Sequence, residues 1–128
     1  MPLEPAIRDL AQAKNFAGFT TLGPTGGPAT HVMWVDADDD HILINTELER
    51  QKCVNVMRDP RVAVMIWDAE NAYKYAEVRG EVVDIERGDR ARAHIDELSQ
   101  KYLGRDYSSP IGSERVILVI EPTRQRYR

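Results

Sequence analysis

The feature that most limits the possible folds is residues 73–86, where polar and apolar residues alternate over a long stretch. A strand with one buried face produces this pattern, because successive side chains point to opposite faces of a sheet. Gly80 lies in the middle of the stretch, and glycine inside a strand indicates a bend or a bulge. We therefore predict a long strand that curves at Gly80, as strands do in a β-barrel.

Five further segments are rich in apolar, aromatic or β-branched residues and predict strands: 16–22, 29–35, 41–45, 61–67 and 113–121. The turn at 23–28 is rich in glycine and proline and predicts a hairpin. It lacks the Lys-Ser/Thr pair of a phosphate loop and joins two strands. The acidic segment 36–40 lacks the EF-hand spacing and is interpreted as a solvated turn. Pro122 is expected to end the last strand.

Two amphipathic helices are predicted, one before the first strand and one before the last strand. The first spans 2–14, with Ile7, Leu10 and Ala11 on one face. The second spans 88–103, with Ala91, Ile95, Leu98 and Tyr102 on one face and Gly104 as its cap. With six strands joined mostly by short turns, the chain is predicted to be a single domain, 1–128, of mainly β (α+β) class: a six-stranded antiparallel barrel with flanking helices.

A third, short helix is predicted to follow the strand 41–45. Thr46 is interpreted as its N-cap and Glu49 completes a capping box, while Asp59-Pro60 ends the helix. Cys53, Val56 and Met57 are expected to form its apolar face. Arg50 and Lys52 near its start oppose the helix dipole unless an anion binds there. In the alternative interpretation, Glu47 and Glu49 satisfy the dipole and the two cations are simply hydrated.

Composition narrows the classes of protein that remain. A net charge of −4 argues against a general nucleic-acid binder. The sequence contains no apolar run that could span a membrane and no signal peptide, so we expect a cytoplasmic protein without membrane contact. Its single cysteine, Cys53, excludes an internal disulfide and a multi-cysteine metal site, and Cys53 is expected to be buried. We predict no metal site and no catalytic side chain, because neither a Ser-His pairing nor an HExxH motif is present.

The order of several short motifs resembles the split-barrel flavin and deazaflavin oxidoreductase superfamily, which includes pyridoxamine 5′-phosphate oxidase-like proteins. The motifs are Gly27-Pro28, HVMW at 31–34, Asn45-Thr46, RQKCVN at 50–55, RDPRVAV at 58–64 and YKYAEVRGEV at 73–82. FMN-binding members often carry adjacent Arg and Lys here. One residue separates Arg50 from Lys52, which with Asn55 is similar to the branch that uses the deazaflavin coenzyme F420. The C-terminal tail does not reproduce the substrate-binding arginines of the oxidase that makes pyridoxal phosphate.

The resemblance implies a split β-barrel homodimer with its cofactor at the interface, and it implies roles for particular residues. Those expected to hold the phosphate and tail of the cofactor are Thr46, Arg50, Lys52 and Asn55. Those expected near the ring are the backbone of His31, Val32 and Met33 and the side chains of Tyr73 and Tyr75. Tyr107 is expected to reach a neighbouring subunit's site. Trp34 and Trp67 are expected in the core, and His31 is expected to be structural rather than a proton donor.

The function implied is that of an F420H2-dependent reductase, which passes a hydride to a conjugated, unsaturated or quinone-like small molecule. Such a cofactor carries the redox chemistry itself, so the protein has only to bind and orient it. Two alternatives stay open: an FMN-dependent oxidoreductase on the same barrel, and a non-catalytic protein that binds a cofactor or haem.

Overall fold

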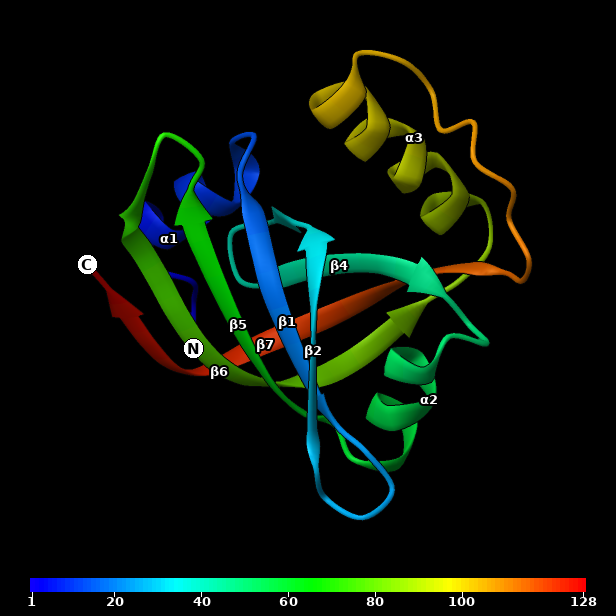
Figure 1. Cartoon of the computed structure of the whole chain (residues 1–128), viewed down its shortest axis with the longest axis horizontal. Helices are drawn as coiled ribbons and strands as arrows, with labels where there is room; N and C mark the ends of the chain where they lie inside the picture. Colours follow the sequence, from blue (N-terminus) through cyan, green and yellow to red (C-terminus); the bar gives the residue numbers. More distant parts are fainter.

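The computed structural model describes all residues, 1–128, and contains seven strands in one antiparallel sheet with three helices around it (Figure 1). In chain order the elements are α1 (Pro5–Gln12), β1 (Phe16–Leu22), β2 (Pro28–Trp34), β3 (Asp36–Ala37), β4 (Ile42–Glu47), α2 (Gln51–Arg58), β5 (Arg61–Asp68), β6 (Asn71–Glu86), α3 (Asp89–Leu103) and β7 (Arg115–Tyr127).

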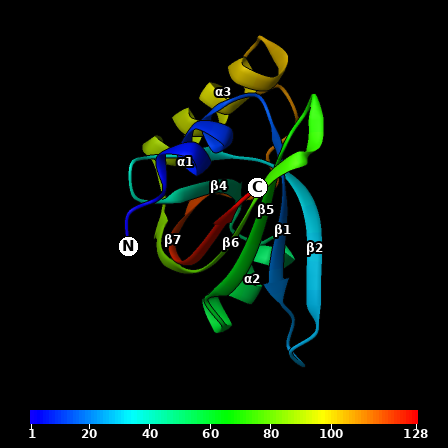
Figure 2. The ribbon, with the colours of Figure 1, turned by 90° about the vertical axis from the view of Figure 1, so that its left-hand side faces the viewer.

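The strand order is β2-β1-β5-β6-β7-β4-β3. The two edge strands, β2 and β3, follow one another in the chain, so Val35 joins the opposite edges of the sheet. The sheet is strongly curled, and α1 and α2 lie at opposite ends of it (Figure 2). The predicted mainly β class and split-barrel architecture are confirmed.

The core lies inside the curled sheet, and the alternation predicted for residues 73–86 holds over residues 75–80. Ala76, Val78 and Gly80 of β6 are buried, and the residues between them are more exposed. Phe19 on β1 and Ile66 on β5 are among the largest fully buried side chains in the same cluster. Burying a side chain of this size contributes about 1.5–3 kcal/mol. The hydrophobic pattern therefore specified which face of the sheet turns inward.

Gly80 marks a close approach between two backbones. A Cβ atom at this position would lie 2.4 Å from the carbonyl oxygen of Glu121, and the β6–β7 register shifts between Arg79 and Gly80. The predicted irregularity at Gly80 is confirmed, and its cause is that only glycine lets β7 come so close.

Two predicted strand boundaries are wrong. Asp36 and Ala37 form the short strand β3, where we predicted a turn over 36–40, and this raises the strand count from six to seven. The last strand continues through Pro122 to Tyr127. Pro122 lies opposite Gly80 at the irregular part of the ladder, where the missing N–H of proline is tolerated.

The predicted capping box at Thr46 is also wrong. Thr46 is buried within β4 and pairs with Val116, because the ladder with β7 takes its backbone groups. The helix α2 begins at Gln51, with Arg50 as an N-cap that makes no side-chain capping bond. Met57 is 63% exposed, whereas Lys52 and Asn55 are buried beside Cys53 and Val56. The predicted face was therefore only partly right.

The long helix α3 confirms its predicted apolar face of Ala91, Ile95, Leu98 and Tyr102. Gly104 ends it in the left-handed conformation that favours glycine. The helix lies against β4 and β7. No helix of the structure combines the length and the apolar character that a bilayer crossing requires.

Candidate functional site

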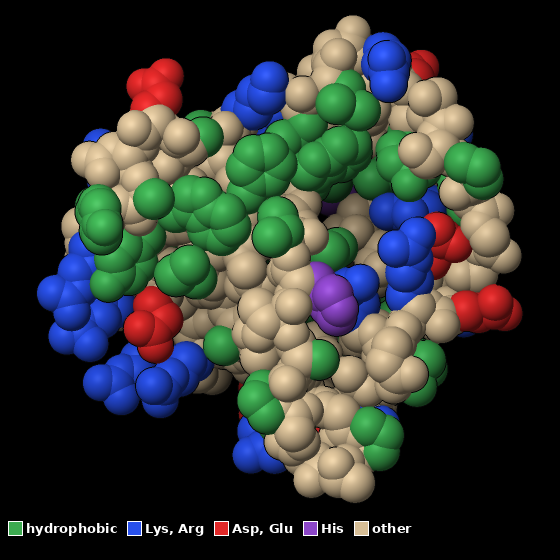
Figure 3. All heavy atoms as spheres, viewed as in Figure 1, with side chains coloured by type: hydrophobic (Ala, Val, Ile, Leu, Met, Phe, Trp, Pro, Cys, Tyr) green, Lys and Arg blue, Asp and Glu red, His purple; other side chains and the backbone are tan.

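A cleft of about 350 Å³ opens where β2, β4 and β7 meet α3 and the loop that follows it. This volume is in the range of small-molecule sites. One side of the cleft carries arginine side chains and the other carries apolar and aromatic ones. Figure 3 shows a hollow in this face of the molecule, with basic side chains beside it and a broad apolar band leading away.

The basic end of the cleft contains more positive than negative charge. Arg50 and Arg115 line it, and both contact the same carboxylate oxygen of Glu47, with Nη2 of Arg50 at 3.1 Å and Nη1 of Arg115 at 3.5 Å. Lys52 is 8% exposed and has no acidic partner within ion-pair distance. Its burial and the two arginines lower its pKa. Two arginines thus share one carboxylate while Lys52 lies close enough to repel them, and an anion at this end would relieve the repulsion.

Glu47 is held by hydrogen bonds at both oxygens. Its Oε1 accepts from the backbone N–H groups of Gly112, at 2.9 Å, and Ser113, at 2.7 Å. Burial alone would raise the pKa of Glu47, but the bonds from Ser113 and Arg50 outweigh this and hold the pKa below its usual value. The carboxylate therefore fixes both the Arg50 side chain and the end of the loop after α3.

The opposite side of the cleft carries two aromatic rings, Trp34 and Tyr107, that lie nearly perpendicular to each other. Trp34 stacks on Tyr102, and its ring is met edge-on by Tyr107 at a centroid distance of 6.3 Å. The guanidinium carbon of Arg115 lies 5.2 Å from the centroid of Tyr107, which links the aromatic side to the basic end. Trp34 was predicted to be a core residue, but the structure places it at the cleft. This arrangement suits a planar ligand that carries a negative group.

Five of the ten predicted site residues come together at this cleft: Val32, Met33, Thr46, Arg50 and Tyr107. Lys52 is close enough to influence the basic end but is not part of the lining. His31 does not line the cleft, although the next two residues do.

Asn55 is engaged inside the protein rather than at the cleft. Its Nδ2 donates to Thr21 Oγ1 at 3.0 Å, and its Oδ1 accepts from Gln51 at 2.7 Å. The amide therefore ties α2 to β1, and contact of Asn55 with a bound phosphate stays a prediction.

Tyr73 and Tyr75 do not line the cleft of their own chain either. Tyr75 on β6 pairs with Trp67 on β5. Trp67 pairs with Phe16 on β1, and Phe16 pairs with Trp34 on β2. Residues opposite one another in a sheet share a face, so Tyr75 and Trp34 are on the same side of the sheet, three strands apart. Tyr73 is 90% exposed. Their contact with a cofactor stays a prediction.

Sequence reasoning missed Asn45 and Arg115 as site residues. Asn45 and Arg115 are buried, and Arg115 Nε donates to Asn45 Oδ1 at 2.9 Å. One signal was available: Arg115 is a cation at the start of a strongly apolar strand, and a buried cation requires partners or a ligand.

Known proteins resemble this chain in sequence and in fold. The sequence profile of the pyridoxamine 5′-phosphate oxidase family matches residues 3–128. A solved structure titled F420 reductase superposes with a TM-score of 0.83 at 29% identity, and the match covers 97% of this chain and 98% of the other. A conserved hypothetical protein of Mycobacterium tuberculosis gives a TM-score of 0.73 at 26% identity, covering 98% of this chain and 84% of the other.

A more distant structure shows the fold alone. It is a Listeria innocua protein assigned to the pyridoxamine 5′-phosphate oxidases, with a TM-score of 0.69 at 20% identity over 95% of this chain and 92% of the other. No curated protein matches the chain in sequence.

Proposed function

Since the chain belongs to the pyridoxamine 5′-phosphate oxidase family, we propose that it is an F420H2-dependent reductase whose cofactor binds in the cleft. The observation that carries this proposal is the pairing of a surplus of positive charge with aromatic side chains in one cleft. Arg50 and Arg115 line its basic end, and Trp34 lines the other side. A phosphate-bearing planar cofactor has both of the matching parts.

The residues of the basic end fit a phosphate group in chemistry as well as charge. The planar guanidinium fork of arginine suits phosphate oxygens, and buried Lys52 adds charge behind it. Half of the Arg50 side chain is exposed, so it is free to meet a ligand that enters from solvent. Thr46, which also lines the cleft, adds a hydroxyl that can donate or accept a hydrogen bond.

The bound deazaflavin would supply a hydride to an electron acceptor, and the chain's own residues would bind, orient and exclude water. Trp34 and Tyr107 provide flat surfaces for planar molecules. Ile95, Leu98 and Leu103 of α3 provide an apolar wall in the same cleft. We infer from these side chains that the acceptor is a conjugated, unsaturated or quinone-like small molecule.

The choice of F420 over FMN is supported by the spacing of Arg50 and Lys52 and by the similarity to an F420 reductase. The family description supports FMN as the second candidate. A non-catalytic protein on the same fold would bind the cofactor without turning over enones or quinones.

We also propose that the functional unit is a homodimer. Val32 and Met65 both lie opposite Gly18, so they share the outer face of β2, β1 and β5, and both are exposed. Tyr75 on β6 pairs with Trp67, which lies opposite Phe16 on this same face, so the face continues onto β6. Figure 3 shows apolar side chains gathered in a broad band on the side of the molecule that faces the viewer. An exposed apolar face of this kind suits contact with another protein surface. Tyr73, Tyr75 and Tyr107 would then contribute to the partner subunit's cofactor site across the interface. Met65→Lys places a charge on this face and should yield monomers in analytical sedimentation. Met57→Lys places a charge on α2, away from this face, and should leave the dimer intact.

The cofactor is tested by titrating F420 and FMN into the wild type and into Arg50→Ala and Arg115→Ala. Losing a hydrogen bond to a charged group costs about 1.5–3 kcal/mol, so each variant should bind its cofactor roughly 10–150-fold more weakly. Arg61→Ala is the matched control, because Arg61 is exposed and paired with Asp59 on the rim of a different cleft. Tighter binding of FMN than of F420, or unchanged affinity in both arginine variants, would contradict the proposal.

A further inference from the structure

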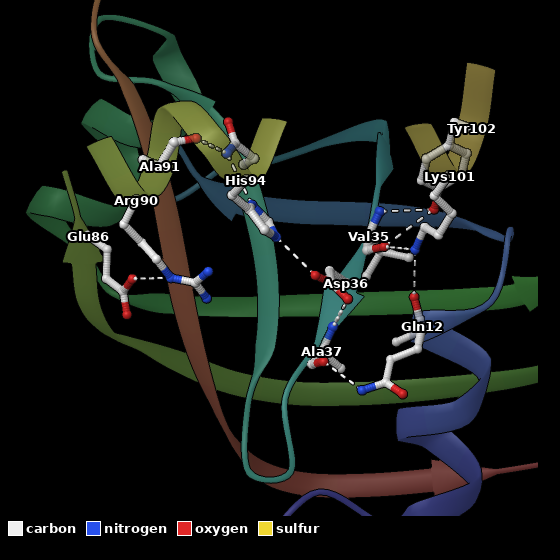
Figure 4. A network of polar contacts seen from close by, with 12 residues as sticks. Gln12, Val35, Asp36, Ala37, Glu86, Arg90, Ala91, His94, Lys101 and Tyr102 are labelled. Atoms are coloured by element: carbon white, nitrogen blue, oxygen red, sulfur yellow. Dashed lines mark hydrogen bonds and ion pairs between the residues drawn. The ribbon is translucent and has the colours of Figure 1, made fainter. Parts of the chain in front are cut away.

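A buried histidine lies directly behind the basic end of the cleft without lining it. His94 on α3 is 1% exposed, and both of its ring nitrogens are engaged. Nε2 lies 2.9 Å from Asp36 Oδ2, and Nδ1 lies 3.1 Å from Asn45 Nδ2. Figure 4 shows the imidazole spanning from the short strand β3 to the amide beside Ala91.

The acidic end of this network fixes the position of the histidine proton. Burial alone would raise the pKa of Asp36, but the bonds from His94 and from the Ala37 N–H outweigh it and hold the pKa below its usual value. Asp36 is therefore an acceptor, and His94 Nε2 must donate to it. In the neutral imidazole, Nδ1 is then an acceptor and receives an N–H from Asn45.

The histidine in turn fixes the orientation of the Asn45 amide. The Nδ2 group of Asn45 donates to Nδ1 of His94 and to the carbonyl of Ala91, at 3.0 Å, so both of its hydrogens are used. The amide oxygen is left facing Arg115, whose Nε donates to it at 2.9 Å. A reversed amide would set its NH₂ group against the Arg115 N–H and lose this bond.

We propose that His94 is a positioning residue that orients Arg115 through Asn45 for contact with the anionic group of the bound cofactor. This inference rests on the proposed function of the cleft. Arg115 is held at Nε by Asn45 and at Nη1 by Glu47. Of the five N–H groups of an arginine, others remain to meet a ligand. His94 acts on the ligand only through the Asn45 amide.

Two substitutions distinguish the contribution of the Nδ1 atom of His94 from that of its Nε2 atom. His94→Asn places an amide oxygen near the position of Nδ1, which keeps an acceptor for Asn45 but does not reach Asp36. His94→Gln extends its amide towards the position of Nε2, which keeps a partner for Asp36 and leaves Asn45 without its acceptor. His41→Gln is the control, because His41 pairs with Asp38 at the surface.

The experiment measures the F420 affinity and the thermal midpoint of each variant. We expect His94→Asn to bind F420 at least about tenfold more tightly than His94→Gln, the factor expected for a hydrogen bond on which a charged contact depends. A merely structural histidine predicts the opposite, because glutamine fills more of the imidazole volume. The proposal would be overturned if the variant with the higher thermal midpoint always bound F420 more tightly, or if the two variants bound F420 equally.

A second readout does not depend on the cofactor. In NMR spectra of the free protein, His94 should carry its proton on Nε2. The Arg115 Nε–H signal should keep its wild-type position in His94→Asn and move in His94→Gln. If the wild type binds neither F420 nor FMN, the proposed function fails, and these signals still decide the network. If the wild type binds but the Arg115 signal is the same in all variants, the positioning role fails alone.

Discussion

The indole ring of Trp34 lies parallel to the ring of Tyr102, with the centroids 5.0 Å apart and 3° between the two planes. Tyr102 is itself fixed, because its hydroxyl donates to the Asn15 carbonyl and accepts from the Val35 N–H. The Trp34 ring in the cleft is therefore oriented by a residue of α3 that does not itself line the cleft. The helix is part of the binding site through this contact.

The Tyr102 hydroxyl should make stability depend on alkaline pH. Burial raises the pKa of Tyr102 from 10.0 to about 12. Because the folded pKa lies above the unfolded one, the contribution of the hydroxyl is complete below pH 10 and is lost as pH rises towards 12. Tyr102→Phe should lose about 1–3 kcal/mol at pH 7, since it leaves buried backbone groups without a partner. Urea unfolding at pH 7 and pH 11 measures this, and an equal loss at both values would contradict it.

Replacing Lys52 by an uncharged residue should weaken cofactor binding and raise the free energy of unfolding. Its ammonium is buried beside Arg50 and Arg115, and both burial and this repulsion lower its pKa. Lys52→Met keeps the length of the side chain and removes the charge, so we expect a gain of about 1–2 kcal/mol in the free energy of unfolding. The affinity for F420 should fall in the same variant. Lys74→Met, at an exposed position, should change neither quantity. A less stable Lys52→Met protein would show that the ammonium has a stabilising partner.

Gly80→Ala should be strongly destabilising for a purely steric reason. The added methyl group would lie 2.4 Å from the Glu121 carbonyl oxygen and 3.0 Å from a methyl of Ile120. Relief requires β6 and β7 to separate, so we expect a loss of about 3 kcal/mol. Gly27→Ala is the control, because a methyl group added there would have no atom within 4 Å of it. Thermal unfolding of both variants measures this loss. Similar thermal midpoints for Gly80→Ala and Gly27→Ala would contradict the steric explanation.

The sequence predicted the elements of the fold better than their ends. The alternation predicted over 73–86 holds at 75–80, where it identified the inward face of β6, because burial sets that pattern directly. The capping box at Thr46 is a local sequence pattern. It does not form, because Thr46 pairs instead within the β4–β7 ladder, and β7 is remote from β4 in the chain. Pro122 failed as a strand end for a similar reason, since the irregular ladder opposite Gly80 accommodates it.

The site was predictable only where a local motif marked it. Arg50 was recognised from its place near the start of a predicted helix and from the family resemblance, and it lines the cleft. Arg115 and Asn45 meet only because β4 pairs with β7, a contact between residues 70 positions apart. Trp34 reaches the cleft because Tyr102 of α3 supports it. Such roles arise from tertiary contacts that no single segment encodes.

Glu47 should make the protein sensitive to acid. Its carboxylate is buried, accepts from the Gly112 and Ser113 N–H groups, and contacts Arg50 and Arg115. These contacts hold its pKa below the ordinary 4.5. Because the folded pKa is depressed, the stabilisation is complete above about pH 4.5 and is lost as pH falls through the folded value.

Glu47→Gln removes this stabilisation at neutral pH and leaves the arginines without a counter-charge. We expect a loss of about 3 kcal/mol at pH 7, the cost of breaking a buried ion pair by removing one partner. The gap between variant and wild type should shrink as pH falls below 4.5, because protonation removes the same charge from the wild type. Urea unfolding at pH 7 and pH 3.5 measures the gap, and exposed Glu49→Gln serves as the control. A gap that is the same at both pH values would mean that Glu47 stabilises the fold through its shape rather than its charge.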